Sequence, residues 1–292
     1  MAFRIITDTG ANITDKVRDH YGIGLVHLTL IMDGEEMQFT STEGFDYDGY
    51  YEKLKDGLKV STSQVNPGQF AECFEKILEN GEDILYIGLS GGVTGSINSA
   101  KMAAADLLDE FPGRQIRIVD SLGASLGEGI LVVEAAECRE KGMSLDETAD
   151  HIDFQKYCMY QVFVVDDLKH LKRTGRISGA LASLGTMMDL KPILKGDTEG
   201  KIVVECKARG RKQAIKALAE KYRDMVVDPE EQIVGISYGG LREDAVHLAN
   251  LISKIAQPKK IWMVAHEPVT GAHVGPGMLA LYFKGADDVR AF

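Results

Sequence analysis

The sequence lacks any long apolar run. Its longest apolar stretches, such as residues 129–133, are far shorter than the run of about 20 residues that spans a bilayer. The first residues also lack the basic, apolar and small-residue order of a secretory signal. We therefore expect a cytoplasmic protein with no transmembrane segment.

Cysteine is scarce and dispersed. The chain has 4 cysteines among 292 residues, and none lies in a C-x-x-C pair or at the spacing of Cys and His metal ligands. This spacing argues against a metal site. The phosphate-binding pattern G-x-x-x-x-G-K-[ST] is absent as well. Any phosphoryl transfer would therefore need a nucleotide site on another protein.

Positive charge is also in short supply. The formal net charge is -11, and the negative excess lies in residues 1–155, whereas residues 156–292 carry slightly more basic than acidic side chains. A net acidic chain without a cluster of basic and aromatic residues is a poor nucleic-acid binder, so we expect no nucleic-acid partner. The uneven charge favours two domains.

Short apolar runs bounded by turn residues are typical of buried parallel strands. Such runs occupy residues 4–7, 84–89, 115–119, 161–165, 232–237 and 260–265. Amphipathic helical patterns lie between them, and residues 191–208 predict a hairpin with a five-residue turn at 196–200. We predict an α/β fold of two α/β domains, residues 1–155 with a mostly parallel sheet and residues 156–292 with a mixed sheet.

Three segments combine hydroxyl groups, glycines and an imidazole at predicted strand or helix ends. Residues 61–64 include Thr62, residues 90–96 include Thr94, and residues 271–277 form a Gly/Pro-rich loop with His273. The second segment precedes a helix predicted from about residue 96 to 109, whose first amides and dipole favour an anion. Simple capping of this helix by Thr94 or Ser96 is the alternative.

Two basic side chains are candidates for the same site. His273 could bind a carboxylate or pass a proton, or it could be purely structural. Arg176 lies in a compact basic loop, residues 172–178, that leads into a predicted helix. Its planar fork can bind an anion bidentately or orient His273, and a solvated charge cluster is the alternative.

Ser90 raises a different possibility. It lies in a G-x-S-x-G pattern at residues 88–92 after a predicted strand, the setting of a hydrolase nucleophile. Asp120, His266 and His273 follow in a suitable order for a catalytic triad. A second match, around Ser237, shows that strand-to-helix turns produce this pattern readily, because they select small residues. A serine hydrolase stays open as an alternative.

Taken together, these segments resemble the DegV family of fatty-acid-binding proteins along nearly the whole chain. The matching pieces are Asp8-Thr9; residues 62–64 with Pro67-Gly68; residues 90–95; 119–121 with 124–127; 175–178; 191–193; 209–212; and 273–277. The resemblance implies two domains with one long-chain fatty acid between them. It implies that Thr62 and Thr94 bind the carboxylate, and that His273 and Arg176 form the neighbouring polar network. The chain departs from the family at Gly91 and Ala272, where hydroxyl-bearing residues are usual.

The resemblance also implies a partner. Such a protein is the lipid-binding subunit of a bacterial fatty acid kinase, and it presents the carboxylate to a separate catalytic subunit that makes an acyl phosphate. This chain would then hold no catalytic residue, no metal and no cofactor other than the bound acid. A lipid sensor without a kinase partner is a further alternative.

Overall fold

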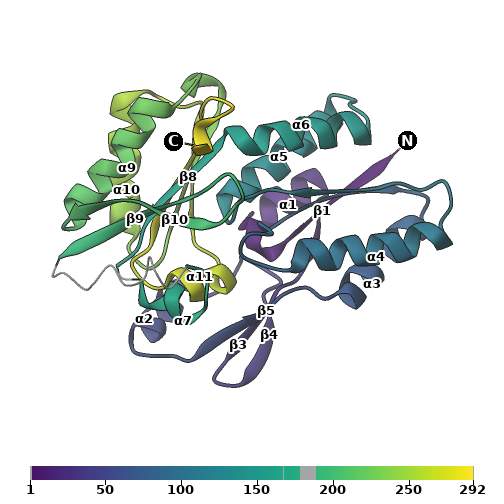
Figure 1. Cartoon of the computed structure of the whole chain (residues 1–292), viewed down its shortest axis with the longest axis horizontal. Helices are drawn as coiled ribbons and strands as arrows, with labels where there is room; N and C mark the ends of the chain where they lie inside the picture. The colour runs from purple at the N-terminus through teal and green to yellow at the C-terminus, as the bar shows by residue number, and fades with distance from the viewer. Residues whose placement is uncertain (1, 167, 178–188, 292) are drawn as a thin grey trace.

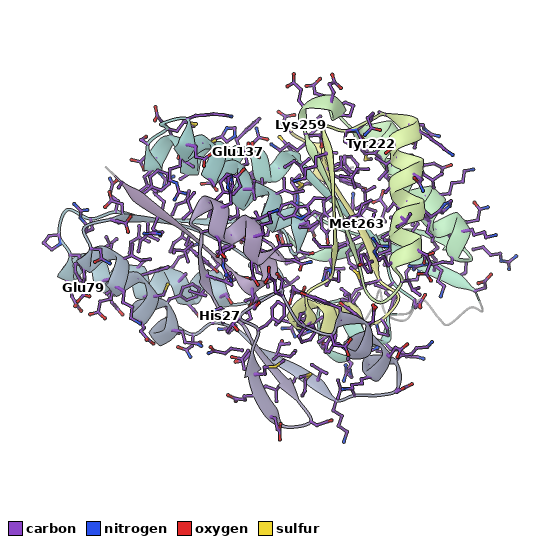
Figure 2. All side chains as sticks on the ribbon, turned by 180° about the vertical axis from the view of Figure 1, so that it is seen from behind. His27, Glu79, Glu137, Tyr222, Lys259 and Met263 are labelled. Atoms are coloured by element: carbon purple, nitrogen blue, oxygen red, sulfur yellow. The ribbon has the colours of Figure 1, made fainter. Side chains whose placement is uncertain are left out.

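The computed structural model describes residues 2–166, 168–177 and 189–291. Two large sheets with their helices lie side by side, and a small third sheet projects from one edge of the molecule (Figure 1). Glu79, at the end of α3, and Tyr222, on α9, lie on opposite sides of the molecule (Figure 2). The predicted α/β class is confirmed, with a parallel sheet in the N-terminal part and a mixed sheet in the C-terminal part.

The N-terminal sheet is built from four parallel strands. Their order is β2 (Gly24–Val26), β1 (Phe3–Asp8), β6 (Asp83–Gly88) and β7 (Ile116–Asp120). Successive side chains of a strand point to opposite faces, so Ile84 and Tyr86 pack in one apolar cluster while Leu85 and Ile87 pack in another. This sheet is therefore buried on both faces.

Helices cover both faces of that sheet. On one face lie α3 (Pro67–Glu79) and α4 (Ser96–Glu110), and α4 is close to the predicted range of 96 to 109. On the other lie α5 (Leu126–Glu140) and α6 (Leu145–Cys158), with η1 (Thr9–Ala11) against α5. Helix α1 (Asp15–Tyr21) follows η1.

The C-terminal sheet has six strands in mixed directions. Their order is β10 (Ile202–Arg209), β9 (Leu190–Gly196), β8 (Met159–Val164), β13 (Leu279–Lys284), β11 (Ile233–Tyr238) and β12 (Lys260–Ala265). The predicted hairpin is confirmed as β9 and β10. The expectation that β8 is a parallel strand is wrong, because both of its neighbours run antiparallel to it. Helices α9 (Arg211–Met225) and α10 (Arg242–Ile255) pack in the apolar cluster on one side of this sheet.

Helix α5 lies between the two large sheets. It packs against β1 and β6 of the N-terminal sheet and against β8, β11 and β13 of the C-terminal sheet. Small residues permit this close packing: a Cβ added at Gly129 would lie 2.4 Å from the carbonyl oxygen of Ala11, and one added at Gly127 would lie 2.4 Å from the side chain of Gln161. A helix enclosed on all sides needs apolar or small residues all round; the buried first turns of α5, residues 126–133, meet this need except at Glu128, and the charged residues near its C-terminal end are less buried.

A three-stranded antiparallel sheet was not predicted. Its order is β4 (Glu35–Gln38), β3 (Thr29–Met32) and β5 (Val60–Ser63). The short helices α2 (Tyr47–Lys55), α7 (Lys169–Arg173) and α11 (Pro268–Val274) lie near it in Figure 1. Two further turns are η2 (Pro229–Glu231) and η3 (Val289–Ala291).

The predicted division at residue 155 stays a prediction. That residue lies within α6, which leads directly into β8. The apolar cluster around α5 contains residues from before and after this point, such as Leu131 and Tyr282. In the described part of the chain, no helix combines the length and the apolar character needed to cross a membrane.

Glu128 is a buried acid in the middle of this packing. One carboxylate oxygen accepts a hydrogen bond from the Thr7 hydroxyl at 2.9 Å, and the other has no hydrogen-bond partner among the described residues. Burial raises the pKa of Glu128 well above its usual range, and the nearby Asp8 raises this pKa further. The native protein therefore retains a proton that the unfolded chain loses above its ordinary pKa of 4.5.

The first prediction concerns the pH dependence of stability. The raised pKa means that the free energy of unfolding falls as pH rises above 4.5, by up to about 1.4 kcal/mol per pH unit for this proton. Glu128→Gln lacks this equilibrium, so its stability relative to the wild type should increase as pH rises from about 5 to about 8. Urea unfolding across this range checks the trend. A difference that stays constant with pH would contradict it.

Candidate functional site

One cavity is lined by side chains from both halves of the chain and by the small sheet. The empty space between its lining atoms is about 910 Å³, part of it open to solvent. Much of the wall is apolar, with Leu28, Leu89, Val93, Phe163, Leu171 and Met278 among its residues. All four predicted site residues, Thr62, Thr94, Arg176 and His273, line this cavity.

Thr62 and His273 are in direct contact. Thr62 lies on β5 of the small sheet, and its hydroxyl oxygen is 2.8 Å from Nε2 of His273. The expectation that His273 lies in a loop is wrong: it lies in the last turn of α11. The flanking Gly271 and Gly275 gave this segment a loop-like sequence. The contact joins residues 211 positions apart, so no local pattern could have revealed it.

The imidazole of His273 is neutral and incompletely bonded. Its pKa is lowered to about 3, chiefly because the ring is buried, and further by the positive charges of Arg176 and Arg173. Nδ1 is buried and has no hydrogen-bond partner among the described residues. A buried polar atom without a partner costs free energy, so a ligand that bonds with Nδ1 would remove that cost.

Arg176 supplies a positive charge without a matching negative one. Its guanidinium is half-buried and donates to the carbonyl oxygen of Thr174, and no carboxylate among the described residues pairs with it. Burial lowers the pKa of Arg176, although an arginine stays charged. The helix predicted to follow, together with Ser178, lies outside the described residues. Arg176 therefore favours an anion in the cavity.

Thr94 lies just before α4, whose first turn is left open. The alternative that Thr94 or Ser96 is the N-cap residue of this helix is wrong: the N-cap residue is Gly95, which has no side-chain acceptor, although the Thr94 hydroxyl accepts from the Ser96 amide at 3.4 Å. The Thr94 hydroxyl lies 3.1 Å from that of Ser96. The side chain of Gln64 accepts from the Gly95 amide at 3.0 Å and connects the end of β5 to this turn. The Gln64 side chain therefore links the strand that carries Thr62 to the turn that carries Thr94, and both threonines line the cavity.

The two departures from the family pattern lie away from the cavity wall. Gly91 is exposed, and its amide donates to Asp120 at 3.1 Å. Ala272 is buried in an apolar cluster. Neither is among the described residues that line the cavity, so the lack of a hydroxyl at these positions leaves its wall unchanged.

Ser90 does not meet an imidazole in this structure. Its hydroxyl is buried and donates to the Gly200 carbonyl at 2.9 Å. The Asp120 carboxylate accepts from backbone amides. His266 and His273 bond to other side chains. The described residues therefore do not assemble the triad that the serine hydrolase alternative requires.

A polar network within the wall was missed by the sequence analysis. The Nδ1 of His266 lies 2.9 Å from the Ser237 hydroxyl, which lies 3.0 Å from the Tyr282 hydroxyl. Nε2 of His266 lies 2.8 Å from the Thr270 hydroxyl, which contacts the Glu267 carboxylate. Burial lowers the pKa of His266 to about 3 and raises the pKa of Glu267 to about 7. An acidic residue before Pro268 is a helix-start signal that could have identified Glu267.

Metal ligation has no support in the described residues, where no group of three or more His, Cys, Asp or Glu side chains is arranged to hold a metal ion. The cavity instead combines an apolar wall with one cationic and hydroxyl-rich region. This combination suits an amphiphilic anion, whose apolar part replaces water along the wall while its charged group meets Arg176, His273 and the two threonines.

Comparison with known proteins gives a consistent result. Residues 2–285 match the DegV family, described as an uncharacterised protein family. A DegV domain-containing protein of Clostridium perfringens is 35% identical over 283 residues, covering 97% of each chain. Among solved structures, a DegV family protein from Thermus thermophilus, described by its fatty acid binding, has a TM-score of 0.88 and 29% identity, covering 98% of this chain and 100% of its own. A fatty acid binding DegV family protein from Streptococcus agalactiae has a TM-score of 0.86 and 28% identity, covering 98% and 99%.

The second prediction concerns the charge state of His273. Because its pKa is lowered to about 3, the ring nitrogens should not titrate between about pH 5 and about pH 8 in the ligand-free protein. Two-dimensional ¹⁵N NMR of the imidazoles, with His273→Asn to assign the signal, measures this. A midpoint near the ordinary value of 6.5 would show that the ring is solvated and the site is not as described.

Proposed function

The chain belongs to the DegV family, and we propose that it binds one long-chain fatty acid in the cavity, with the carboxylate at Thr62, Thr94, His273 and Arg176. The observation that carries the proposal is that, among the described residues, the positive charge of Arg176 has no carboxylate partner and Nδ1 of the neutral His273 has no hydrogen-bond partner, at the polar region of a largely apolar cavity. The relatives from T. thermophilus and S. agalactiae are described as fatty-acid-binding proteins, which supports the same ligand here.

The Thr62–His273 pair offers a carboxylate one donor in either tautomer. If the proton is on Nδ1, Nε2 accepts from the Thr62 hydroxyl and the Nδ1–H is free to donate to the ligand. If the proton is on Nε2, that N–H donates to Thr62 and frees the hydroxyl proton for the ligand. Thr94 and the open first turn of α4 add further donors, and Arg176 supplies the charge.

The acyl chain supplies most of the affinity. Burial of about 15 methylenes at about 0.8 kcal/mol each gives on the order of 12 kcal/mol before the costs of ordering the chain and immobilising the ligand. The polar groups contribute less, but they fix which end of the acid lies at Thr62. We place the ligand between an N-terminal domain, residues 1–155, and a C-terminal domain, residues 156–292.

We further propose that this chain makes no bond itself. It holds the carboxylate for in-line attack on the γ-phosphate of ATP bound by a separate fatty acid kinase subunit, so that the bond to ADP breaks and an acyl phosphate forms. The absence of a phosphate-binding loop from the sequence supports a nucleotide site on another protein. Such a partnership with an ATP-dependent enzyme fits a cytoplasmic location.

The third prediction tests the head-group residues. Replacement of Thr62 and Thr94 together by Val removes two hydroxyl donors while keeping side-chain shape. Because hydrogen bonds to a charged group are stronger than neutral ones, the Kd for oleate should rise at least ~10-fold. Isothermal titration of delipidated protein gives the affinity, and native mass spectrometry gives the lipid retained during purification.

Thr148→Val is the matched control. Thr148 is buried in α6, and its hydroxyl has no hydrogen-bond partner among the described residues. The same chemical change there should leave oleate affinity unaltered. Equal oleate affinity in the double variant, the control and the wild type would reject the assignment of the site.

The fourth prediction concerns the kinase. Oleate-loaded protein, ATP and a bacterial fatty acid kinase catalytic subunit should yield acyl phosphate, which hydroxylamine traps as the hydroxamate, and omission of this protein should abolish the product. Oleate binding without acyl phosphate would favour a lipid sensor. Covalent labelling by a fluorophosphonate, abolished by Ser90→Ala, would favour a serine hydrolase instead.

A further inference from the structure

Helix α11 is a short element with an unusual start. It has only seven residues, Pro268–Val274, and carries His273 in its last turn. Helices of this length are not stable alone in water, so its position depends on contacts at its ends. Its N-cap residue is Glu267, which is completely buried.

The Glu267 carboxylate holds the first turn of α11. It accepts from the amide of Val269 at 2.6 Å and from the amide of Thr270 at 2.7 Å, and it also bonds with the Thr270 hydroxyl. From α2, the Tyr50 hydroxyl donates to the Pro268 carbonyl at 2.7 Å. A carboxylate that accepts from the first amides of a helix also interacts favourably with the helix dipole.

The same carboxylate sets the direction of the network in the cavity wall. A carboxylate only accepts, so the Thr270 hydroxyl donates to Glu267 and its oxygen accepts from Nε2–H of His266. Nδ1 of His266 then accepts from Ser237, which accepts from Tyr282. His266, Thr270 and Tyr282 line the cavity. In this series of hydrogen bonds, each bonded pair therefore has one donor and one acceptor, and the imidazole of His266 carries no charge.

We infer that Glu267 is a positioning residue of the carboxylate site, because its bonds to α11 hold His273 against Thr62. The inference rests on the proposed function, in that the site it positions is the one assigned to the fatty acid. Glu267 touches no ligand in this account. It acts through the five residues of α11 that lie between it and His273, and through the wall that faces the acyl chain.

Two helix caps elsewhere provide a comparison. Ser144 caps α6 and Asn66 caps α3, each in a reciprocal capping box at an exposed position on a longer helix. Those caps stabilise helices that also have large packed faces. Loss of either should reduce stability without moving a group of the cavity, whereas loss of the Glu267 cap should displace His273.

Two substitutions of Glu267 distinguish a role in capping α11 from a role in filling space. Gln at position 267 has the size of Glu but presents an NH2 group to amides that need an acceptor. Asp is smaller and remains a good N-cap residue. Positioning through the cap predicts that Glu267→Asp keeps oleate affinity near the wild-type value, while Glu267→Gln weakens it roughly 5- to 10-fold. A space-filling role predicts the opposite order.

Oleate titration at about pH 8 keeps Glu267 ionised, since its pKa is about 7. Ser144→Ala is the control, expected to lower the melting temperature without changing oleate affinity. The ¹⁵N signals of His273 should shift in Glu267→Gln and match the wild type in Glu267→Asp. Wild-type oleate affinity and wild-type His273 signals in Glu267→Gln would overturn the inference.

Failure of the proposed function gives a different result. If the wild-type protein takes up no oleate, the ligand assignment fails, but the His273 signals of the three proteins still report whether Glu267 positions the imidazole. The two claims are therefore decided by separate measurements.

Discussion

The burial of α5 between two sheets is the constraint on which the rest of the structure depends. This helix contacts strands of both sheets, and the two halves of the chain share one apolar cluster. Close approach requires Gly127 and Gly129, where any larger residue would collide with Gln161 or Ala11. Because this helix contacts both sheets, the ends of their strands are held at a fixed separation, and the cavity lies among residues from both.

The cavity favours an anion because its positive charge is not already paired with a carboxylate of the described residues. Arg176 has no carboxylate partner among the described residues, and its charge helps keep His273 neutral. A preformed ion pair would have stabilised the empty protein, but a ligand would then have to displace it. The apolar wall contributes binding free energy but does not orient the ligand, while Thr62 and His273 determine which end of the ligand lies beside them. The histidine that lines the deeper wall, His266, is kept neutral by burial, so the only positive charge we assign to the site lies at its polar region.

Much of the fold could be predicted because its strands are apolar runs between turn residues. All six predicted runs are strands, and α4 and the β9–β10 hairpin lie close to their expected bounds. The small sheet was missed because strands such as Glu35–Gln38 are short and mostly polar. The direction of β8 depends on its partner β13, more than 100 residues later, which local periodicity does not encode. Thr62, Thr94, Arg176 and His273 were singled out from the residue pattern and given their roles through a resemblance, whereas the helix beneath His273 and the role of Glu267 needed three-dimensional contacts.

The place of β13 in its sheet has a consequence for how the chain is made. It is the last strand in sequence among the described residues, yet it lies between β8 and β11, both of which are synthesised earlier. On the ribosome, the strands of the N-terminal sheet emerge early enough to pair with one another, since β7 ends at Asp120. In the C-terminal sheet, β8 and β11 cannot be joined until β13, which pairs with both, has left the exit tunnel. Only then can the wall that bears Tyr282 form, so a nascent chain cannot enclose a ligand before β13 has emerged.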